Sequence, residues 1–162
     1  MPATVMQTAQ STREQVTQHV TRLALQVNVP LVHYLVVGRG ACHDLDTLLV
    51  LLVIIQRANR HPGFGRLDPA DLTAGRLDEL PTLRVNMQSI ADSTGIPRES
   101  VRRKVAELVQ CGWVARDGAN LRFTVDGYLA IAPLREAAVD MTCAISDAVN
   151  RIMQPPPPGS PG

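Results

Sequence analysis

Residues 86–124 read N-M-Q-S-I-A-D-S-T-G-I-P-R-E-S-V-R-R-K-V-A-E-L-V-Q-C-G-W-V-A-R-D-G-A-N-L-R-F-T, and this stretch decides the fold. Asn86 is a good N-cap for a first helix, because its side-chain oxygen can accept a hydrogen bond from an otherwise unpaired backbone N–H. Gly95 suits the left-handed conformation found at helix C-termini. Pro97 fits the start of a second helix, where its fixed φ is favourable and its missing N–H costs nothing. The sequence therefore predicts two short helices joined by a turn.

The second helix is expected over residues 97–111, with Gly112 ending it. Its apolar residues recur at spacings of four and three, which places them on one buried face; they are Val101, Val105 and Leu108. After this helix, residues 113–114 and 121–124 are predicted to form two short strands. Asp117-Gly118, which lies between them, is typical of tight hairpins. The pattern predicts a helix-turn-helix followed by a β-wing.

Residues 90–114 resemble the winged helix-turn-helix of bacterial transcription regulators. The resemblance is closest to the DNA-binding domain of the Crp/Fnr superfamily, with similarity to GntR and MarR. In that pattern a small residue, here Ala91, lets the two helices approach, Gly95 makes the turn, and Val101 is buried in the recognition helix. Lys104 stands where the pattern usually has an aliphatic residue, and Val105 can take over its packing. Nothing in the chain resembles the cyclic-nucleotide-binding barrel of Crp/Fnr proteins, so their ligand does not carry over.

The resemblance implies that the second helix enters the major groove of double-stranded DNA, with Arg98, Glu99 and Arg103 at base-reading positions. Arginine can donate two hydrogen bonds to guanine, and glutamate can accept one from cytosine N4. Ser100 and Arg102 are better placed for phosphates, which fix register without reading sequence. The full set of predicted DNA-binding residues is Arg98, Glu99, Ser100, Arg102, Arg103, Lys104, Arg116 and Arg122, the last two flanking the wing tip.

The charge distribution favours the same partner. The chain as a whole carries a formal charge of only +1, whereas residues 98–104 hold four cations and one anion. Such a local excess indicates an anionic partner more strongly than a uniformly basic chain would. Two alternatives stay open: the run is a solvated helix face, or the winged helix is a protein-interaction module that does not bind DNA.

Length and composition exclude several other classes. A chain of 162 residues that is 45% hydrophobic can form one domain, or a small domain with dimerising extensions. The few aromatic residues argue against a single-strand binder, which stacks bases on exposed rings. No local Ser-His-Asp or Cys-His signature, phosphate loop or HExxH motif occurs. The sequence therefore predicts neither an enzyme nor a cofactor.

Three cysteines, Cys42, Cys111 and Cys143, are odd in number and widely spaced, which indicates a reducing compartment and not a disulfide framework. The first residues do not show the charged segment followed by an apolar segment that is typical of a secretory signal peptide. The longest uninterrupted apolar run, residues 48–55, is too short to span a membrane. We expect a cytoplasmic protein without a membrane partner. Two interpretations of Cys42-His43-Asp44 stay open. The thiol and imidazole could form a metal or redox sensor site, although the spacing typical of paired metal ligands is lacking. Alternatively, the segment is a loop in which Asp44 is the N-cap of the following helix.

The rest of the chain divides by composition. The predicted segments are a disordered N-terminus at 1–10, N-terminal helices for dimerisation or core packing at 11–60, a loop at 61–82, the winged DNA-binding domain at 83–125, a C-terminal dimerisation helix at 126–153 and a disordered Pro-rich tail at 154–162. Within the second segment, a helix at 11–28 begins with a capping box at Ser11 and Glu14. Residues 31–37 follow Pro30 and are too few for periodicity to distinguish helix from strand; a short helix that ends at Gly38 and Gly40 is favoured. The next helix, at 44–59, is apolar almost all round, so it should be buried on several sides. A groove beside residues 48–55 could hold an unidentified small-molecule effector or could be ordinary core packing.

The C-terminal helix, capped by Asp126, carries a heptad-like seam. Its members alternate at spacings of three and four, and they are Ile131, Leu134, Ala138, Met141, Ile145, Ala148 and Ile152. Such a seam packs either on the chain's own N-terminal helix or on a second copy. A two-fold homodimer would place two recognition helices on successive major-groove faces, roughly 34 Å apart. We therefore expect a mainly α homodimer, with a small β-wing and terminal helices that dimerise.

Overall fold

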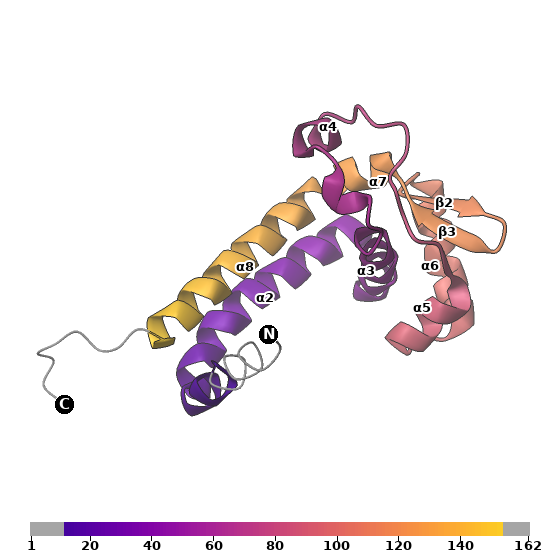
Figure 1. The fold of residues 1–162 in the computed structure, drawn as a ribbon. Coiled ribbons are helices and arrows are strands. Elements are labelled where there is room, and N and C mark those ends of the chain that lie inside the picture. The colour runs from indigo at the N-terminus through magenta and orange to yellow at the C-terminus, as the bar shows by residue number, and fades with distance from the viewer. Residues whose placement is uncertain (1–11, 154–162) are drawn as a thin grey trace, which may run out of the picture. The chain divides into compact units, whose positions relative to one another are not determined.

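The computed structural model describes residues 12–153, which are mainly helical with one small antiparallel sheet, as predicted. The terminal segments 1–10 and 154–162, and Ser11, lie outside the described residues. Residues 12–18 are helical. The elements that follow in Figure 1 are α2 (Val20–Cys42), α3 (Leu45–Asn59), η1 (Phe64–Arg66), α4 (Pro69–Thr73), β1 (Val85–Asn86), α5 (Met87–Thr94), α6 (Arg98–Gln110), β2 (Val114–Asp117), β3 (Asn120–Phe123), α7 (Val125–Ala130) and α8 (Ala132–Met153).

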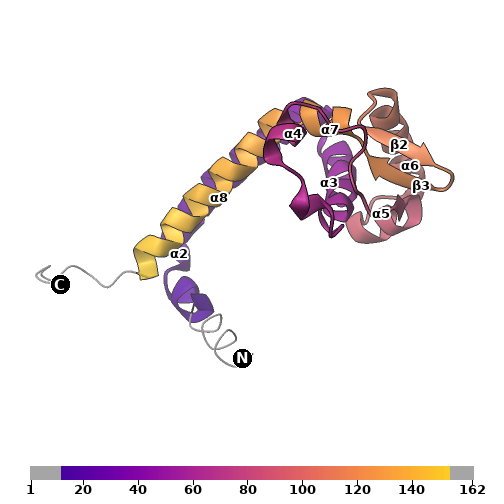
Figure 2. The ribbon, with the colours of Figure 1, turned by 45° about the horizontal axis from the view of Figure 1, so that its top comes forward.

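The chain divides into two compact units. Unit 1 comprises residues 1–36 and 135–162, and unit 2 comprises residues 37–134. In the described part of unit 1, α2 and α8 run side by side in opposite directions (Figures 1 and 2). Unit 2 contains the helix-turn-helix and the wing.

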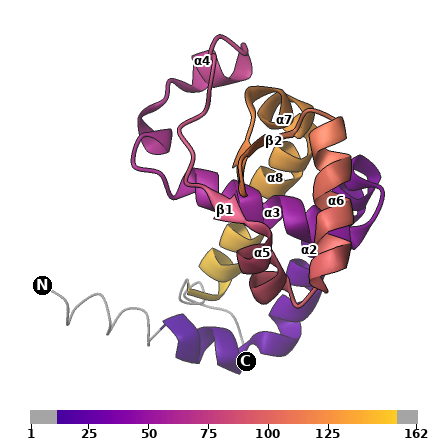
Figure 3. The ribbon, with the colours of Figure 1, turned by 90° about the vertical axis from the view of Figure 1, so that its right-hand side faces the viewer.

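Helix α3 is the central element of unit 2, where it packs against α5, α6 and β3 (Figure 3). Its buried residues are Thr47, Leu48, Val50, Leu51, Ile54 and Ala58. The core is completed by side chains that are almost fully buried on the other three elements: Ile90, Val101, Val105, Leu108, Leu121 and Phe123. The prediction that the most apolar helix is buried on several sides is therefore confirmed.

Local signals set the ends of the helix-turn-helix as predicted. The Asn86 side chain accepts a hydrogen bond from Ser89 N at 2.9 Å, which caps α5. Gly95 follows with a φ of 71°, the left-handed conformation that ends a helix at little cost for glycine. The recognition helix spans Arg98–Gln110, with Pro97 just before it, so the predicted range of 97–111 was one residue too long at each end.

The wing is an antiparallel hairpin to which a third strand is added. The strand order is β1-β3-β2, and Asp117 pairs with Asn120, so the turn residues are Gly118 and Ala119. Gly118 supplies the positive φ, 59°, that the tight turn needs. The third strand, β1, lies just before α5, and its Val85 pairs with Leu121.

The N-terminal helices differ from the prediction. Instead of one helix to residue 28 and a second at 31–37, residues 12–18 form one helix and α2 runs without interruption from Val20 to Cys42. Pro30 removes one backbone hydrogen bond but does not end the helix. Gly38 does not end it either, because this glycine serves packing: an added Cβ would lie 2.5 Å from Leu48 Cδ2.

Helix α2 is long and apolar enough to cross a membrane by length and composition, with a mean hydropathy of 1.3 over its most apolar window. The sequence-based prediction that no segment spans a membrane had considered only uninterrupted apolar runs, and polar residues interrupt the apolar residues of α2. Core helices of soluble proteins and signal sequences pass the same test, so this observation is weak by itself. Only 6% of the window is buried within the chain, so α2 presents much of its surface to solvent or to a partner.

The C-terminal helix also differs, because it is two helices. Thr124, and not Asp126, caps the first of them: its hydroxyl accepts from Gly127 N at 2.9 Å. α7 ends at Ala130, and α8 begins two residues later with Pro133 in its first turn. Proline cannot donate to a preceding carbonyl and clashes with it, which favours the break seen just before Pro133. The predicted 61–82 loop likewise contains a short helix, α4, capped by Asp68.

Replacing Gly127 by alanine will lower stability by about 1–3 kcal/mol, the usual cost of overpacking a core. An added Cβ would lie 2.5 Å from the Trp113 carbonyl oxygen and 2.9 Å from its Cα, which are backbone atoms that cannot rotate away. Gly40→Ala is the control, because nothing lies within 4 Å of an added Cβ in that helical position. It should be neutral or stabilising. Equal urea midpoints for the two variants would contradict the packing argument.

Candidate nucleic-acid interface

The recognition helix α6 presents one apolar face to the core and one polar face to solvent. Val101 and Val105 are fully buried on the inner side. On the outer side the first two turns carry the predicted base-reading and phosphate-contacting residues: Arg98, Glu99, Arg102 and Arg103 are exposed, and Ser100 is half-buried. The structure therefore brings five of the eight predicted site residues together on one accessible stretch of helix.

Within this stretch the charges are not equivalent. Arg102 donates to both carboxylate oxygens of Glu99, at distances of 2.5–3.1 Å. This hydrogen bonding from Arg102 lowers the pKa of Glu99, and the nearby charge of Arg103 adds to the effect. By contrast, the guanidinium groups of Arg98 and Arg103 have no hydrogen-bond or ion-pair partner among residues 12–153. These two cations are therefore available to an external anion or base edge without breaking an internal contact.

Lys104 does not lie on this exposed face of α6. Its side chain is only 11% exposed, and its ammonium contacts Asp44 Oδ2 at 2.5 Å. Asp44 is also the N-cap of α3, accepting from Thr47 N at 2.8 Å and from Thr47 Oγ1 at 3.0 Å. The pair thus ties the recognition helix to the start of the central helix. This position takes Lys104 out of the exposed surface that was predicted to meet DNA.

The wing adds a second cluster of cations. Arg116 is exposed on β2, while Arg122 on β3 pairs with Glu79 at 2.9 Å. Arg84, which the sequence reasoning had missed, pairs with Asp117 at 2.8 Å. These residues line a hollow of about 390 Å³ beside the wing. Arg84 directly precedes β1, the strand that pairs with the wing.

On the expectation from the sequence that Arg122 meets a DNA phosphate, replacing Glu79 by glutamine should raise affinity for DNA about two- to fivefold, because it frees Arg122 and removes a negative charge beside the wing. Asp71→Asn is the control: it removes the same charge from another surface ion pair, Asp71–Arg76 at 2.7 Å on α4. Fluorescence anisotropy at fixed salt measures both. An equal gain for the two variants would show a general charge effect and not a local one.

The structure offers little for the sensor hypothesis at Cys42-His43-Asp44. Cys42 is buried, and burial, followed by the charges of Asp44 and Cys111, raises its pKa to about 11. A thiol with this pKa stays protonated near neutral pH, whereas metal ligation and redox reactivity need the thiolate. His43 points its side chain to solvent and has a positive φ of 67°. No cluster of three metal-ligating side chains occurs in the described part of the chain.

The predicted effector site beside residues 48–55 stays a prediction. A hollow of about 350 Å³ lies between α3 and α5. It is lined mainly by the aliphatic side chains of Leu49, Leu52 and Val53. No charged group lines it, so nothing there marks a particular ligand.

The comparisons with known proteins agree with this geometry. The family model described as the IclR helix-turn-helix domain matches residues 82–118, which include β1, α5, α6 and β2. No curated protein and no solved structure matches the chain. The similarity to Crp/Fnr proteins is not confirmed. The matched segment points to a regulator rather than an enzyme, and residues 82–118 are similar to a DNA-binding domain of winged helix-turn-helix transcription regulators.

Proposed function

We propose that the protein is a sequence-specific transcription regulator that binds double-stranded DNA as a homodimer and places α6 in the major groove. The observation that carries this proposal is the accessible face of α6, where Arg98 and Arg103 have no internal partner among the described residues, within a segment similar to a DNA-binding domain. An α-helix fits the major groove, and the side chains of its first turns reach base edges.

The roles follow from the charges and their partners. Arg98 and Arg103 read guanine, and Glu99 accepts from cytosine or holds Arg102 in place through their hydrogen bonds. Arg102, Ser100 and the wing arginines Arg116 and Arg122 contact phosphates. Lys104 positions the helix through Asp44. This division predicts that only Arg98, Glu99 and Arg103 change which sequence is preferred.

Two further features belong to the same proposal. A single recognition helix reads few base pairs, so a two-fold dimer that reads two half-sites supplies the remaining specificity. A regulator of this kind works in the cytoplasm, and no cofactor enters its proposed mechanism. An effector is left open.

The deciding experiment titrates the purified protein against duplex DNA from its own upstream region and against a scrambled duplex, at near-physiological salt. A preference of roughly a thousandfold or more is expected for a specific site. If the two affinities are equal, the same titration over a genomic fragment library locates the operator. Absence of binding to any duplex at low salt would overturn the proposal and favour a winged helix that binds proteins.

A further inference from the structure

An apolar stripe runs along α2 without a partner in the chain. Four aliphatic side chains recur at spacings of four, three and four, and all are more than half exposed: Leu25 at 73%, Val29 at 69%, Val32 at 57% and Val36 at 56%. Contiguous exposed apolar patches on soluble proteins often mark interaction sites.

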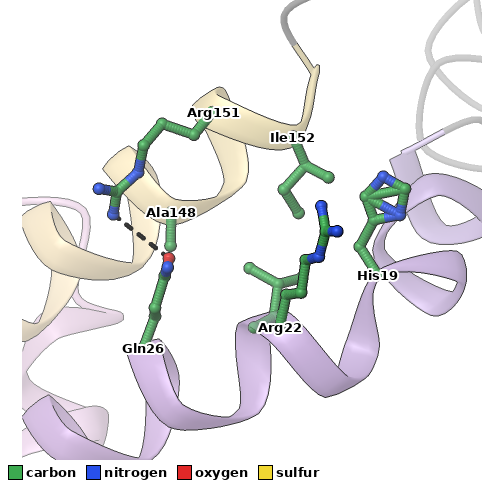
Figure 4. A pocket seen from close by; sticks show the side chains of 7 residues that line it. His19, Arg22, Gln26, Ala148, Arg151 and Ile152 are labelled. Atoms are coloured by element: carbon green, nitrogen blue, oxygen red, sulfur yellow. Dashed lines mark hydrogen bonds between the residues drawn. The ribbon is translucent and has the colours of Figure 1, made fainter. Parts of the chain in front are cut away.

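The stripe is separate from the face that α2 turns toward α8. Each residue advances a helix by about 100°, so Leu23 lies about 200° from Leu25. Leu23 is 5% exposed and lies opposite Ala148, which is 1% exposed. Figure 4 shows Ala148 on this face of α8 and, beside it, the hydrogen bond from Arg151 Nη2 to Gln26 Oε1, which is 3.2 Å long. Helix α2 therefore has two apolar faces, and the chain covers only one of them.

Polar residues flank the uncovered stripe. Arg22 and His33 are exposed on one side of it, and Asn28 is exposed on the other. A membrane span would place His33 and Asn28 in hydrocarbon at considerable cost. A narrow stripe with heptad spacing and polar edges is instead the pattern of a helix that packs against another helix.

A groove lies next to the stripe. Between α2 and α8 there is a hollow of about 500 Å³, lined largely by the apolar side chains of Leu25, Val29, Pro30 and Ala144. Two stripe residues form its wall, so a helix laid along the stripe would also fill the groove. Stripe and groove together offer both knobs and a hole for helix packing.

We propose that a second copy of α2 covers this surface, so that the homodimer forms through the stripe Leu25-Val29-Val32-Val36 of both protomers. A two-fold contact requires a self-complementary surface, and stripe against stripe provides one. The inference rests on the proposed homodimer and names its interface. It replaces the predicted α8 seam, whose members Leu134 and Ala148 are already buried within one copy.

Charge supports a second copy as the occupant. Helix α2 contains no acidic residue, and its charged residues are Arg22 and Arg39. On α8, exposed carboxylates at Glu136, Asp140 and Asp147 recur at spacings of four and seven and so share one face, and Asp147 lines the groove. None of the three has an ion-pair partner within the described residues. A second copy of the cationic α2, laid along the groove, comes close to this anionic face at the rim of the interface, which favours association of like chains.

The test compares two variants of the full chain that add the same kind of charge. Val29→Glu/Val32→Glu places carboxylates in the stripe, and Val139→Glu places one on the outer face of α8, where the native side chain is 61% exposed. Sedimentation velocity across a concentration series measures mass, and circular dichroism checks helix content. We expect wild type and Val139→Glu to be dimers and the stripe variant to be a helical monomer, with the dimer dissociation constant raised at least a hundredfold.

The possible failures are distinguishable. If wild type is a monomer both free and on its DNA site, the homodimer itself is wrong. If wild type is a dimer that the stripe variant leaves intact, the homodimer stands and this interface is wrong. If wild type instead co-sediments with phosphatidylcholine vesicles and the stripe variant does not, the stripe is a membrane contact and the proposal is overturned.

Discussion

Replacing Arg98 and Arg103 together by alanine will abolish most of the preference for the specific DNA site. Each bidentate contact to a base contributes about 1–3 kcal/mol of discrimination, so the double variant should lose about 2–6 kcal/mol if the two contacts are independent. Neither guanidinium has a partner within residues 12–153, so neither substitution removes an internal contact there. Thermal stability should stay close to wild type.

The control must remove two positive charges elsewhere. Arg60 and Arg66 are both exposed and lie outside α6, the wing and the proposed dimer interface, and their double replacement by alanine changes the net charge by the same amount. Anisotropy titrations with specific and scrambled duplexes then separate two effects. The Arg98/Arg103 variant should approach equal affinity for both duplexes, whereas the control should keep its preference. If both variants lose affinity equally for both duplexes, the face of α6 does not read bases.

Arg102 provides an internal contrast on the same helix. Because it is proposed to contact phosphate, its loss should weaken binding to all sequences alike and reduce the salt slope by about one. Its substitution also frees Glu99, whose pKa the hydrogen bond from Arg102 lowers. Loss of Arg98 or Arg103 is thus expected to reduce sequence preference, whereas loss of Arg102 is expected to reduce affinity for all sequences. A model based on net charge alone would predict the same effect for all three.

The features that the sequence predicted correctly are those decided within a few residues. The Asn86 cap and the Gly95 terminator follow from the chemistry of one side chain and its nearest backbone groups. The buried face of α6 follows from spacings of four and three. Predictions failed where distant packing overrides a local preference: Pro30 and Gly38 read as helix breakers but lie inside α2.

Predictions about the site residues were likewise correct where local sequence decides their position and incorrect where the tertiary fold decides it. Exposure of Arg103 follows from its position opposite Val101 and Val105 on the helix. Arg98 lies on the same side as these valines but is exposed at the first residue of α6. The placement of Lys104 could not be read in this way, because its partner, Asp44, lies sixty residues earlier. The pairing of Arg122 with Glu79 is likewise a product of the tertiary fold. Local periodicity gives the face of a helix, but not which of its charges are already neutralised.

Replacing Asp44 by alanine will be the most destabilising of the charge-removing changes, at about 2–4 kcal/mol. Loss of the N-cap of α3 costs about 1 kcal/mol. In addition, the Lys104 ammonium, whose side chain is only 11% exposed, would lose its main partner, at a cost of about 1–3 kcal/mol. Urea denaturation of the variant against wild type measures the sum.

Lys104→Met separates the two contributions. This change removes the buried ammonium and leaves Asp44, 39% exposed, to cap α3 with help from water, so it should lie within about 1 kcal/mol of wild type. In the Asp44→Ala/Lys104→Met double variant, only the cap is missing, and most of the loss seen in Asp44→Ala should be recovered. A double variant as unstable as Asp44→Ala would mean that the cap alone matters and that the ion pair does not position α6.

The pH dependence provides an independent check on the same group. Burial alone would raise the pKa of Asp44, but hydrogen bonds from Lys104 and Thr47 outweigh it and lower the pKa from 3.8 to about 2. A carboxylate with a depressed pKa stabilises the fold fully above its unfolded value and loses this contribution as pH falls. Wild type should therefore lose stability relative to Asp44→Ala as pH falls from about 4 to about 2. Because the alanine variant has no carboxylate to protonate, parallel pH profiles for the two proteins would exclude Asp44 as the group that fastens the recognition helix to α3.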